Sequence, residues 1–250
     1  MKIGIAGYGY VGKAHEHVLK DYYDLIISDP EQGHYGDLKH ADAIIICVST
    51  PSNNHGFCDV NNVGDVIDEG PDVPYLIKST MSCEGWRLIT DCCKNKDITY
   101  SPEFLRAKHW QSDSVLSDKM YLGGKSTQFW SDIFITALGK ISIELGEPTE
   151  LIAAKQLRNS YLALKVTFFN QVKDFCEAQD LDFEEVRKVI TDDARIGASH
   201  SYVTDERGYG GHCFPKDVLA TIRSARVAGS SLTILEEADL YNGTFRKEST

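Results

Sequence analysis

The stretch KIGIAGYGYVG, residues 2–12, decides the fold at the amino-terminal end. A short apolar run leads into Gly7, Gly9 and Gly12 in the spacing G-x-G-x-x-G, and a helical pattern begins directly behind them. The first glycine permits a tight turn, the second lets a pyrophosphate approach the backbone, and the third lets the helix pack closely on the strand. The stretch therefore predicts a strand, a turn and a helix whose N-terminus binds a dinucleotide.

Asp29 indicates which dinucleotide binds. It follows Gly7 by 22 residues and ends the next expected strand. A carboxylate at this place accepts hydrogen bonds from an adenosine ribose and repels a 2′-phosphate, which favours NAD over NADP. A flavin fits less well, because nothing else in the chain indicates an isoalloxazine pocket. The alternative is that the glycines only form a tight turn and that Asp29 only caps the strand.

The first 145 residues alternate short β-branched runs with helical segments. Such alternation predicts a Rossmann-type, doubly wound parallel sheet with helices on both faces, and we assign residues 1–147 to an NAD-binding domain. The runs expected as strands are KIGIAG (2–7), DLIISD (24–29), AIIICVS (43–49), YLIKST (75–80), ITYSP (98–102), KMYLGG (119–124) and ISIEL (141–145).

The character of the chain changes at Pro148. The stretch TELIAAKQLRNSYLALKVTFFNQVKDFCEAQ, residues 149–179, keeps apolar residues at helical spacing for about eight turns at roughly 3.6 residues per turn. A helix of this length usually spans between domains or packs against a partner subunit. We expect residues 148–250 to form a small all-α domain that can carry the contact with a partner subunit, with further helices at 182–193, 215–229 and 231–247.

Composition excludes several function classes. A chain of 250 residues with 42% hydrophobic residues can bury a substantial core, and its net charge of -11 argues against a nucleic-acid surface. The longest apolar runs are too short to cross a bilayer, and the amino terminus does not resemble an export signal, so we expect a cytoplasmic protein. The seven cysteines show neither a CxxC pair nor zinc spacing, which fits a reducing compartment and predicts no metal site.

The stretch GYGGHCFPKD, residues 208–217, places one cysteine where it could react. Cys213 lies just before a helix expected to begin at Pro215, Lys216 is close by, and Asp217 stands one turn further on. Helix N-termini and nearby cations favour the thiolate, which is the nucleophilic form of cysteine. An isolated cysteine is more often a small buried hydrophobe.

Lys155 and Asn159 form a second polar pair, four residues apart in the long helix. This spacing puts both side chains on one helical face, about one turn apart. A lysine and an amide aimed at one point can hold an oxyanion. Taken alone, such a pair is more often part of a solvated face.

Together these residues resemble the UDP-glucose/GDP-mannose 6-dehydrogenases. The glycine turn is similar to the amino-terminal fingerprint of that family, and GYGGHCFPKD is similar to its catalytic cysteine loop. The motifs occur in the family's order along almost the whole chain. The other similar stretches are CVSTP (47–51), IKST (77–80), SPEFLR (101–106) and AAKQLRNSYLAL (153–164).

The resemblance implies an enzyme that oxidises the C6 alcohol of a nucleotide sugar to a carboxylate in two NAD-dependent steps. It implies that Cys213 forms a thiohemiacetal and then a thioester, and that Lys155 and Asn159 stabilise oxyanions. It also implies that Asp217 orients a water molecule, and that Thr80 and Glu103 lie near that water, with Glu103 acting in thioester hydrolysis. The residues expected to hold the cofactor are Gly7, Gly9, Tyr10, Val11, Gly12, Asp29, Val48, Ser49, Thr50, Thr80 and Lys216. Those expected to hold the sugar nucleotide are Glu103, Phe104, Leu105, Arg106, Lys155, Asn159, Arg195, Tyr209 and Gly210.

Arg195 resembles the arginine that family members extend to the partner's sugar nucleotide, which implies a homodimer built on the long helix. The expected substrate is UDP-glucose, while GDP-mannose and N-acetylated UDP-hexosamines stay open. The chain departs from the family at Ala107, where a second glutamate is usual. It also stops before the usual further Rossmann-like domain, so we expect a truncated member.

Two other functions stay open. The chain could be a non-catalytic protein that binds NAD or a sugar nucleotide and acts with a partner chain. It could also be a 6-phosphogluconate or β-hydroxyacid type of dehydrogenase, although those enzymes need no nucleophilic cysteine.

Overall fold

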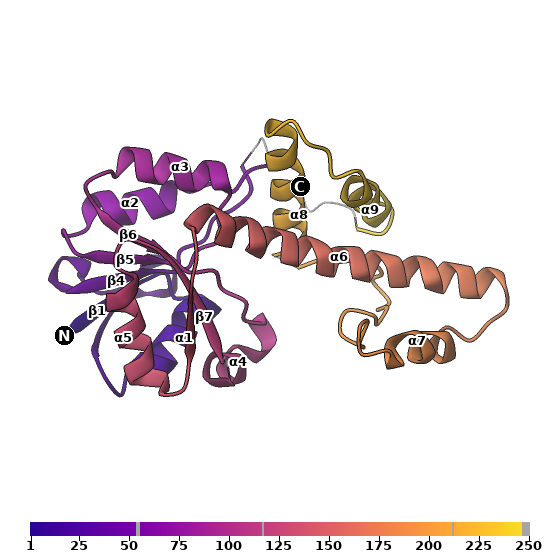
Figure 1. Ribbon diagram of the computed structural model, residues 1–250, viewed down its shortest axis with the longest axis horizontal. Coiled ribbons are helices and arrows are strands. Elements are labelled where there is room, and N and C mark those ends of the chain that lie inside the picture. The colour runs from indigo at the N-terminus through magenta and orange to yellow at the C-terminus, as the bar shows by residue number, and fades with distance from the viewer. Residues whose placement is uncertain (54–55, 117, 212, 247–250) are drawn as a thin grey trace. The chain divides into compact units, whose positions relative to one another are not determined.

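The computed structural model describes residues 1–53, 56–116, 118–211 and 213–246 (Figure 1). The chain divides into two compact units. The first contains Met1–Asn53 and Cys58–Lys155, and the second contains the rest of the described chain. The division falls inside the long helix, so one continuous element begins in the first unit and continues into the second.

An eight-stranded sheet forms the centre of the first unit, with the strand order β3-β2-β1-β4-β5-β6-β7-β8. Most neighbouring strands run parallel, which confirms the predicted α/β class. The strands are β1 (Lys2–Ala6), β2 (Asp24–Asp29), β3 (His34–Tyr35), β4 (Ala43–Ile46), β5 (Pro74–Ile77), β6 (Asp97–Tyr100), β7 (Lys119–Gly124) and β8 (Ser142–Leu145).

The sheet differs from the predicted parallel arrangement at two of its strand pairs. β3 pairs antiparallel with β2, and its two residues are too few to show a periodic pattern. β7 pairs antiparallel with β6 through Thr99 with Gly124 and Tyr100 with Gly123. This register means that β7 begins beyond the carboxyl end of β6 and runs back toward it. The chain direction therefore reverses between β6 and β7, whereas a parallel pair would need a crossover over a face of the sheet.

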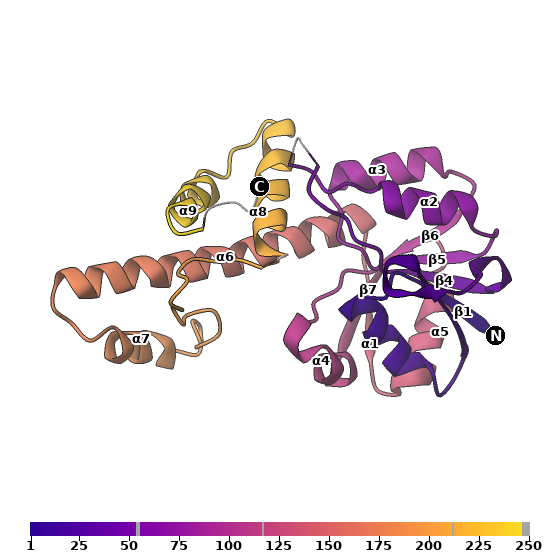
Figure 2. The ribbon, with the colours of Figure 1, turned by 180° about the vertical axis from the view of Figure 1, so that it is seen from behind.

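Helices cover both faces of this sheet (Figures 1 and 2). Side chains of β4 alternate between the two faces, as strand geometry requires. Ile44 and Ile46 pack in one core cluster with residues of α2 and α3, whereas Ala43 and Ile45 pack in another with residues of α1 and α5. The helices are α1 (Tyr10–Leu19), α2 (Asn61–Glu69), α3 (Cys83–Cys92) and α5 (Thr127–Leu138). A further short helix, α4 (Trp110–Leu116), lies in the segment between β6 and β7 and was not predicted.

The second unit is helical, as expected. α6 (Pro148–Ala178) has 31 residues and is about 46 Å long at 1.5 Å per residue. α7 (Phe183–Asp192), α8 (Phe214–Val227) and α9 (Thr233–Gly243) follow, which confirms the three shorter predicted helices to within a few residues. Ala163 of α6 packs in a core cluster with residues of α8 and α9. Within the described residues, the helices are all too short or too polar to cross a membrane.

Candidate functional site

The glycine turn after β1 is built as a close-packed corner with one open side. Gly7 has a φ of +88°, and a Cβ placed there would lie 2.7 Å from the Cys47 carbonyl. At Gly12 a Cβ would lie 2.2 Å from the Gly7 oxygen, so the helix packs directly on the turn. A Cβ on Gly9, the N-cap of α1, would meet nothing within 4 Å. The turn thus leaves space beside backbone at a helix N-terminus, which suits a pyrophosphate.

Asp29 braces the same turn from the end of β2. Its Oδ2 accepts a hydrogen bond from the Tyr8 N–H at 2.6 Å, and its Oδ1 accepts one from the Gln32 N–H at 3.2 Å. The Tyr8 ring lies 4.3 Å from the His34 ring, and its hydroxyl donates to Glu16, which together with burial raises the pKa of Tyr8 to about 12. Asp29 therefore joins the end of β2 to the glycine turn, beside the aromatic pair of Tyr8 and His34.

The segments after β4 and β5 are tied to each other by hydrogen bonds. The Thr50 hydroxyl donates to the Thr80 carbonyl at 2.6 Å, and the Ser79 hydroxyl donates to the Val48 carbonyl at 2.7 Å. The Ser49 carbonyl accepts from the Asn62 amide at 3.1 Å. These residues stand at the carboxyl ends of parallel strands, the edge at which open α/β sheets bind ligands.

Glu103, expected to act in catalysis, is tightly held in the first unit. Its Oε1 accepts hydrogen bonds from the Phe104 and Leu105 N–H groups at 2.7 and 3.1 Å, and its Oε2 lies 3.1 Å from Lys78 Nζ. Burial alone would raise the pKa of this carboxyl, but the Lys78 ammonium and the hydrogen bonds outweigh it and hold the pKa below the usual range. Glu103 is thus an ionised group with both oxygens engaged.

His15 of α1 joins this pair, and nothing in the sequence pattern pointed to it. Its Nε2 lies 3.8 Å from Glu103 Oε2, and the side chain is 7% exposed. Burial, followed by the Lys78 cation, lowers the pKa of His15 to about 3, so the imidazole is neutral at pH 7. It was missed because His15, Lys78 and Glu103 lie on three separate elements.

The rest of the segment expected to bind the sugar makes two contacts within the first unit. Lys155 Nζ lies 5.3 Å from the centre of the Phe104 ring, a cation–π distance. Arg106 forms a forked ion pair with Asp113, with its Nη2 2.6 Å from Oδ1 and its Nε 2.9 Å from Oδ2. The hydrogen bonds from Arg106 lower the pKa of Asp113 to about 2. Ala107 begins a short 3-10 turn on the surface.

In the second unit, Cys213 directly precedes α8, as predicted. One turn into that helix, Asp217 is only 1% exposed and accepts a hydrogen bond from the Asn159 amide at 2.6 Å. The Lys216 ammonium lies 2.8 Å from the other oxygen of Asp217. The unit thus brings together Asn159, Lys216 and Asp217 one turn from the thiol.

Two asparagines that sequence reasoning missed hold the glycine loop before Cys213. The side chain of Asn242 accepts from the Tyr209 N–H at 2.7 Å and donates to the Tyr209 carbonyl at 3.1 Å, while Asn170 accepts from the Gly208 N–H at 3.0 Å. Gly208 has a φ of +59°, and a Cβ there would lie 2.3 Å from Asn242 Oδ1. Asn170 follows Asn159 by about three helical turns, a spacing that could have revealed it.

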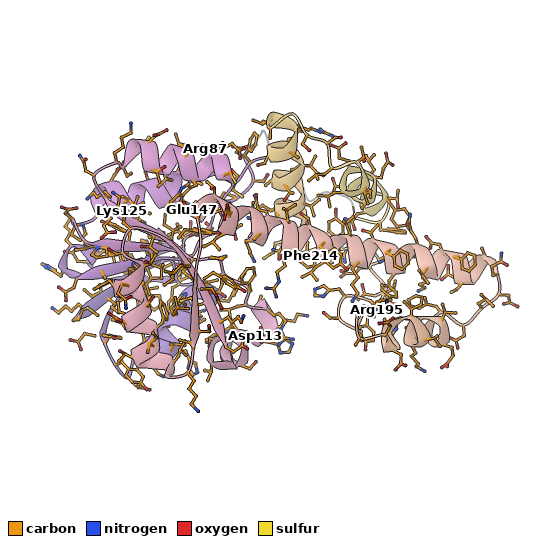
Figure 3. All side chains as sticks on the ribbon, viewed as in Figure 1. Arg87, Asp113, Lys125, Glu147, Arg195 and Phe214 are labelled. Atoms are coloured by element: carbon orange, nitrogen blue, oxygen red, sulfur yellow. The ribbon has the colours of Figure 1, made fainter. Side chains whose placement is uncertain are left out.

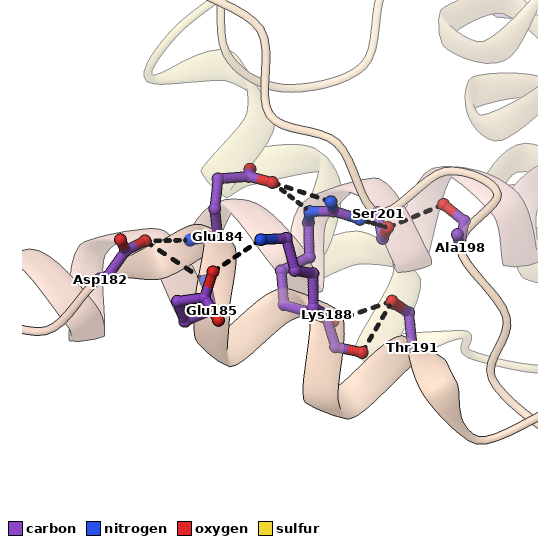
Figure 4. A network of polar contacts seen from close by, with 8 residues as sticks. Asp182, Glu184, Glu185, Lys188, Thr191, Ala198 and Ser201 are labelled. Atoms are coloured by element: carbon purple, nitrogen blue, oxygen red, sulfur yellow. Dashed lines mark hydrogen bonds and ion pairs between the residues drawn. The ribbon is translucent and has the colours of Figure 1, made fainter.

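Arg195 lies on the loop after α7, with its side chain 89% exposed (Figure 3). It pairs with Asp193 at 2.5 Å. The base of this loop is fixed by Arg187, a buried residue of α7 whose side chain donates to Glu184 and to Ser201. Both acceptors are labelled in Figure 4. The loop is therefore anchored while its arginine stays at the surface.

Known proteins are similar to this chain in sequence and in fold. Residues 150–244 match the description "UDP-glucose/GDP-mannose dehydrogenase family, central domain". The match covers the part of the chain that contains Asn159, Cys213 and Asp217. A UDP-glucose 6-dehydrogenase of Rickettsia felis is 32% identical over 199 residues, which are 74% of this chain and 44% of that protein. A UDP-glucose 6-dehydrogenase of Pseudomonas aeruginosa is 26% identical over 248 residues, which are 91% of this chain and 54% of that protein.

Solved structures show the same fold. A UDP-glucose dehydrogenase from Pyrobaculum islandicum superposes with a TM-score of 0.81 at 22% identity, over 97% of this chain and 68% of that one. A 3-hydroxyisobutyrate dehydrogenase of Mycobacterium tuberculosis superposes with a TM-score of 0.73 at 15% identity, over 99% of this chain and 94% of that one. The chain thus spans about half the length of the curated relatives it matches, and its fold occurs in two kinds of dehydrogenase.

Proposed function

We propose that the chain is an NAD-dependent dehydrogenase of a nucleotide sugar that oxidises a C6 alcohol to a carboxylate, with UDP-glucose as the expected substrate. The observation that carries this proposal is the Cys213 thiol at the start of α8, one turn from the buried Asn159–Asp217 pair. A single oxidation of an alcohol needs one hydride transfer and no covalent capture, so it would leave such a thiol without a use. The names of the sequence relatives support the substrate class.

The cofactor site is proposed in residues 1–147. The open backbone beside Gly9 suits the pyrophosphate, and Asp29 at the end of β2 suits the ribose. Val48, Ser49, Thr50 and Thr80 border the same edge of the sheet. Bound NAD would accept one hydride in each of the two oxidations.

The thiol chemistry is proposed in residues 148–250. Cys213 adds to the aldehyde carbon left by the first oxidation and gives a thiohemiacetal, whose proton passes to solvent or a nearby base. Loss of hydride from that carbon gives a thioester, and water hydrolyses it to the carboxylate and restores the thiol. Lys155 and Asn159 donate to the oxyanions, and Asp217 orients the water.

Assembly as a homodimer is part of the proposal. Three aromatic side chains of α6, Tyr161, Phe168 and Phe175, recur every seven residues and are 64, 54 and 60% exposed. A repeat of seven places them along one helical stripe, the pattern of a helix that packs against another helix. Replacing Phe168 with Glu should convert a dimer to monomers in sedimentation velocity. A wild-type chain that sediments as a monomer at micromolar concentration would contradict this.

A binding-only protein is the second candidate, and two observations favour it. Both oxygens of Glu103 are engaged by neighbours, and Ala107 supplies no carboxylate nearby. Such a protein would retain NAD or the sugar nucleotide and act with a partner chain. Counting the NADH formed per nucleotide sugar consumed separates this candidate from the dehydrogenase.

The test is to count the NADH formed per nucleotide sugar consumed, for the wild type and for Cys213→Ser. The control is Cys92→Ser, because Cys92 is exposed on α3 and far along the chain from the proposed chemistry. We expect two NADH per sugar in the wild type and in the control, and a loss of about 1,000-fold or more in Cys213→Ser. NAD binding without NADH formation, for every nucleotide sugar supplied, would reject the dehydrogenase and leave the binding protein.

A further inference from the structure

Three ionisable side chains from separate elements meet in the first unit. His15 comes from the middle of α1, Lys78 directly follows β5, and Glu103 follows β6. Their side chains are 7, 2 and 16% exposed, respectively. Lys78 also donates to the Ser101 hydroxyl at 2.9 Å. A buried charge is normally paired with an opposite charge. Lys78 and Glu103 therefore stabilise each other at the carboxyl edge of the sheet.

Within the cluster, Glu103 serves as an anchor. Its Oε1 holds two successive backbone N–H groups, those of Phe104 and Leu105, so the carboxylate fixes the start of the segment 101–106. Its Oε2 faces the Lys78 ammonium at 3.1 Å. A carboxylate that accepts these hydrogen bonds and forms this ion pair is a weak base, because protonation would break the ion pair.

His15 is the member whose polar atom is not satisfied. Among the described residues, its Nε2 has no hydrogen-bond partner, although buried polar atoms nearly always have one. Its distance of 3.8 Å from Glu103 Oε2 exceeds a direct hydrogen bond. Two polar atoms at this separation can both lie about 2.8 Å from one water molecule, and Lys78 can supply a third contact to it.

We propose that His15 is a positioning residue that fixes Glu103, through one bridging water molecule, and thereby holds the segment 101–106 against the cofactor helix α1. α1 begins at the glycine turn, whereas the segment 101–106 carries Phe104 and Arg106, which are expected to meet the sugar nucleotide. His15 thus links the order of the sugar-nucleotide segment to the helix that binds the dinucleotide. The kinetic consequence rests on the proposed function, but the contact itself does not.

The kinetic test compares His15→Phe, which fills the space without a polar atom, with His15→Gln, which can still reach a water molecule. The exposed His40→Phe is the matched control. We expect His15→Phe to raise the KM for the nucleotide sugar about tenfold with little change in kcat or in NAD affinity, and His15→Gln to recover most of it. Equal KM values for the two His15 variants would overturn the positioning role.

Two measurements test the contact without any activity, so their outcome is independent of the proposed function. In a double-mutant cycle of His15→Phe and Glu103→Gln, the loss in Tm of the double variant should be smaller than the sum of the losses of the two single variants. A loss equal to that sum would show that the two side chains are not coupled and would overturn the contact. If Glu103→Gln does not fold, nitrogen NMR of wild-type His15 replaces the cycle. Lys78 and Glu103, which also act on the Cys47 thiol, are the charged groups beside His15, and His15 should stay neutral at pH 5 with a hydrogen-bonded Nε2. Titration near the ordinary value of about 6.5 would overturn the proposal.

Discussion

Glu103 in the first unit and Asp217 in the second are two buried carboxylates of similar chemistry held in different ways. Glu103 is bound by two backbone N–H groups and by Lys78, a residue of the neighbouring strand end. Asp217 is bound by two side chains, the Asn159 amide and the Lys216 ammonium. Backbone donors cannot move without the loop, whereas side-chain donors can rotate away. The first carboxylate is therefore a fixed part of the fold, and the second can exchange a partner for a substrate or for water.

Replacing Glu103 with Gln should have the largest effect on stability. The change leaves the Lys78 ammonium buried without its counter-charge, and breaking a buried ion pair in this way costs about 3–5 kcal/mol. Urea unfolding at pH 7 measures the loss. A loss comparable with that of an exposed pair, such as Arg106 with Asp113, would mean that the Glu103 pair is hydrated.

Replacing Asp217 with Asn should cost less stability and more activity. Asn keeps the shape of the side chain, and Lys216, with 18% of its side chain exposed, can turn to solvent, so we expect a loss of about 1–3 kcal/mol. NADH formation should fall far more than in Glu103→Gln, measured per folded molecule. If Glu103→Gln lost more NADH formation than Asp217→Asn, the chemistry would lie at Glu103 and the contrast between the two carboxylates would be wrong.

The sequence was informative wherever local pattern determines structure. The glycine spacing correctly predicted a tight turn, in which Gly7 has a positive φ. The apolar periodicity after Pro148 predicted α6 almost to the residue. β3 escaped prediction because two residues carry no period, and the direction of β7 escaped because strand pairing depends on contacts far apart in the chain.

The candidate site divides in the same way. The thiol at the start of α8 could be predicted, because a cysteine ahead of a proline-led helix is a local signal. His15 could not, since its partners Lys78 and Glu103 are 63 and 88 positions away and a lone histidine inside an amphipathic helix looks like an ordinary core residue. Asn242 is a similar case, because its importance depends on where the Tyr209 backbone lies.

Acid should reveal the cost of keeping His15 neutral. The pKa of His15 is about 3 in the folded chain and about 6.5 in the unfolded chain, so between these values the unfolded chain binds a proton that the folded chain does not. Stability must therefore fall as the pH falls, with a slope of up to about 1.4 kcal/mol per pH unit from this group alone.

The comparison with His15→Phe isolates this contribution from those of the carboxylates. Because Phe does not titrate, the stability difference between wild type and variant should shrink by about 1.6 kcal/mol as the pH is lowered from 6.5 to 5. The depressed pKa of Glu103 should steepen the loss only at lower pH, near the unfolded value of about 4.3, where unfolded glutamates begin to take up protons. Urea titrations of both proteins at several pH values measure the difference. A difference that does not change with pH would show that His15 takes up its proton equally well in the folded chain, so that the buried cluster around Glu103 would have to be open to water.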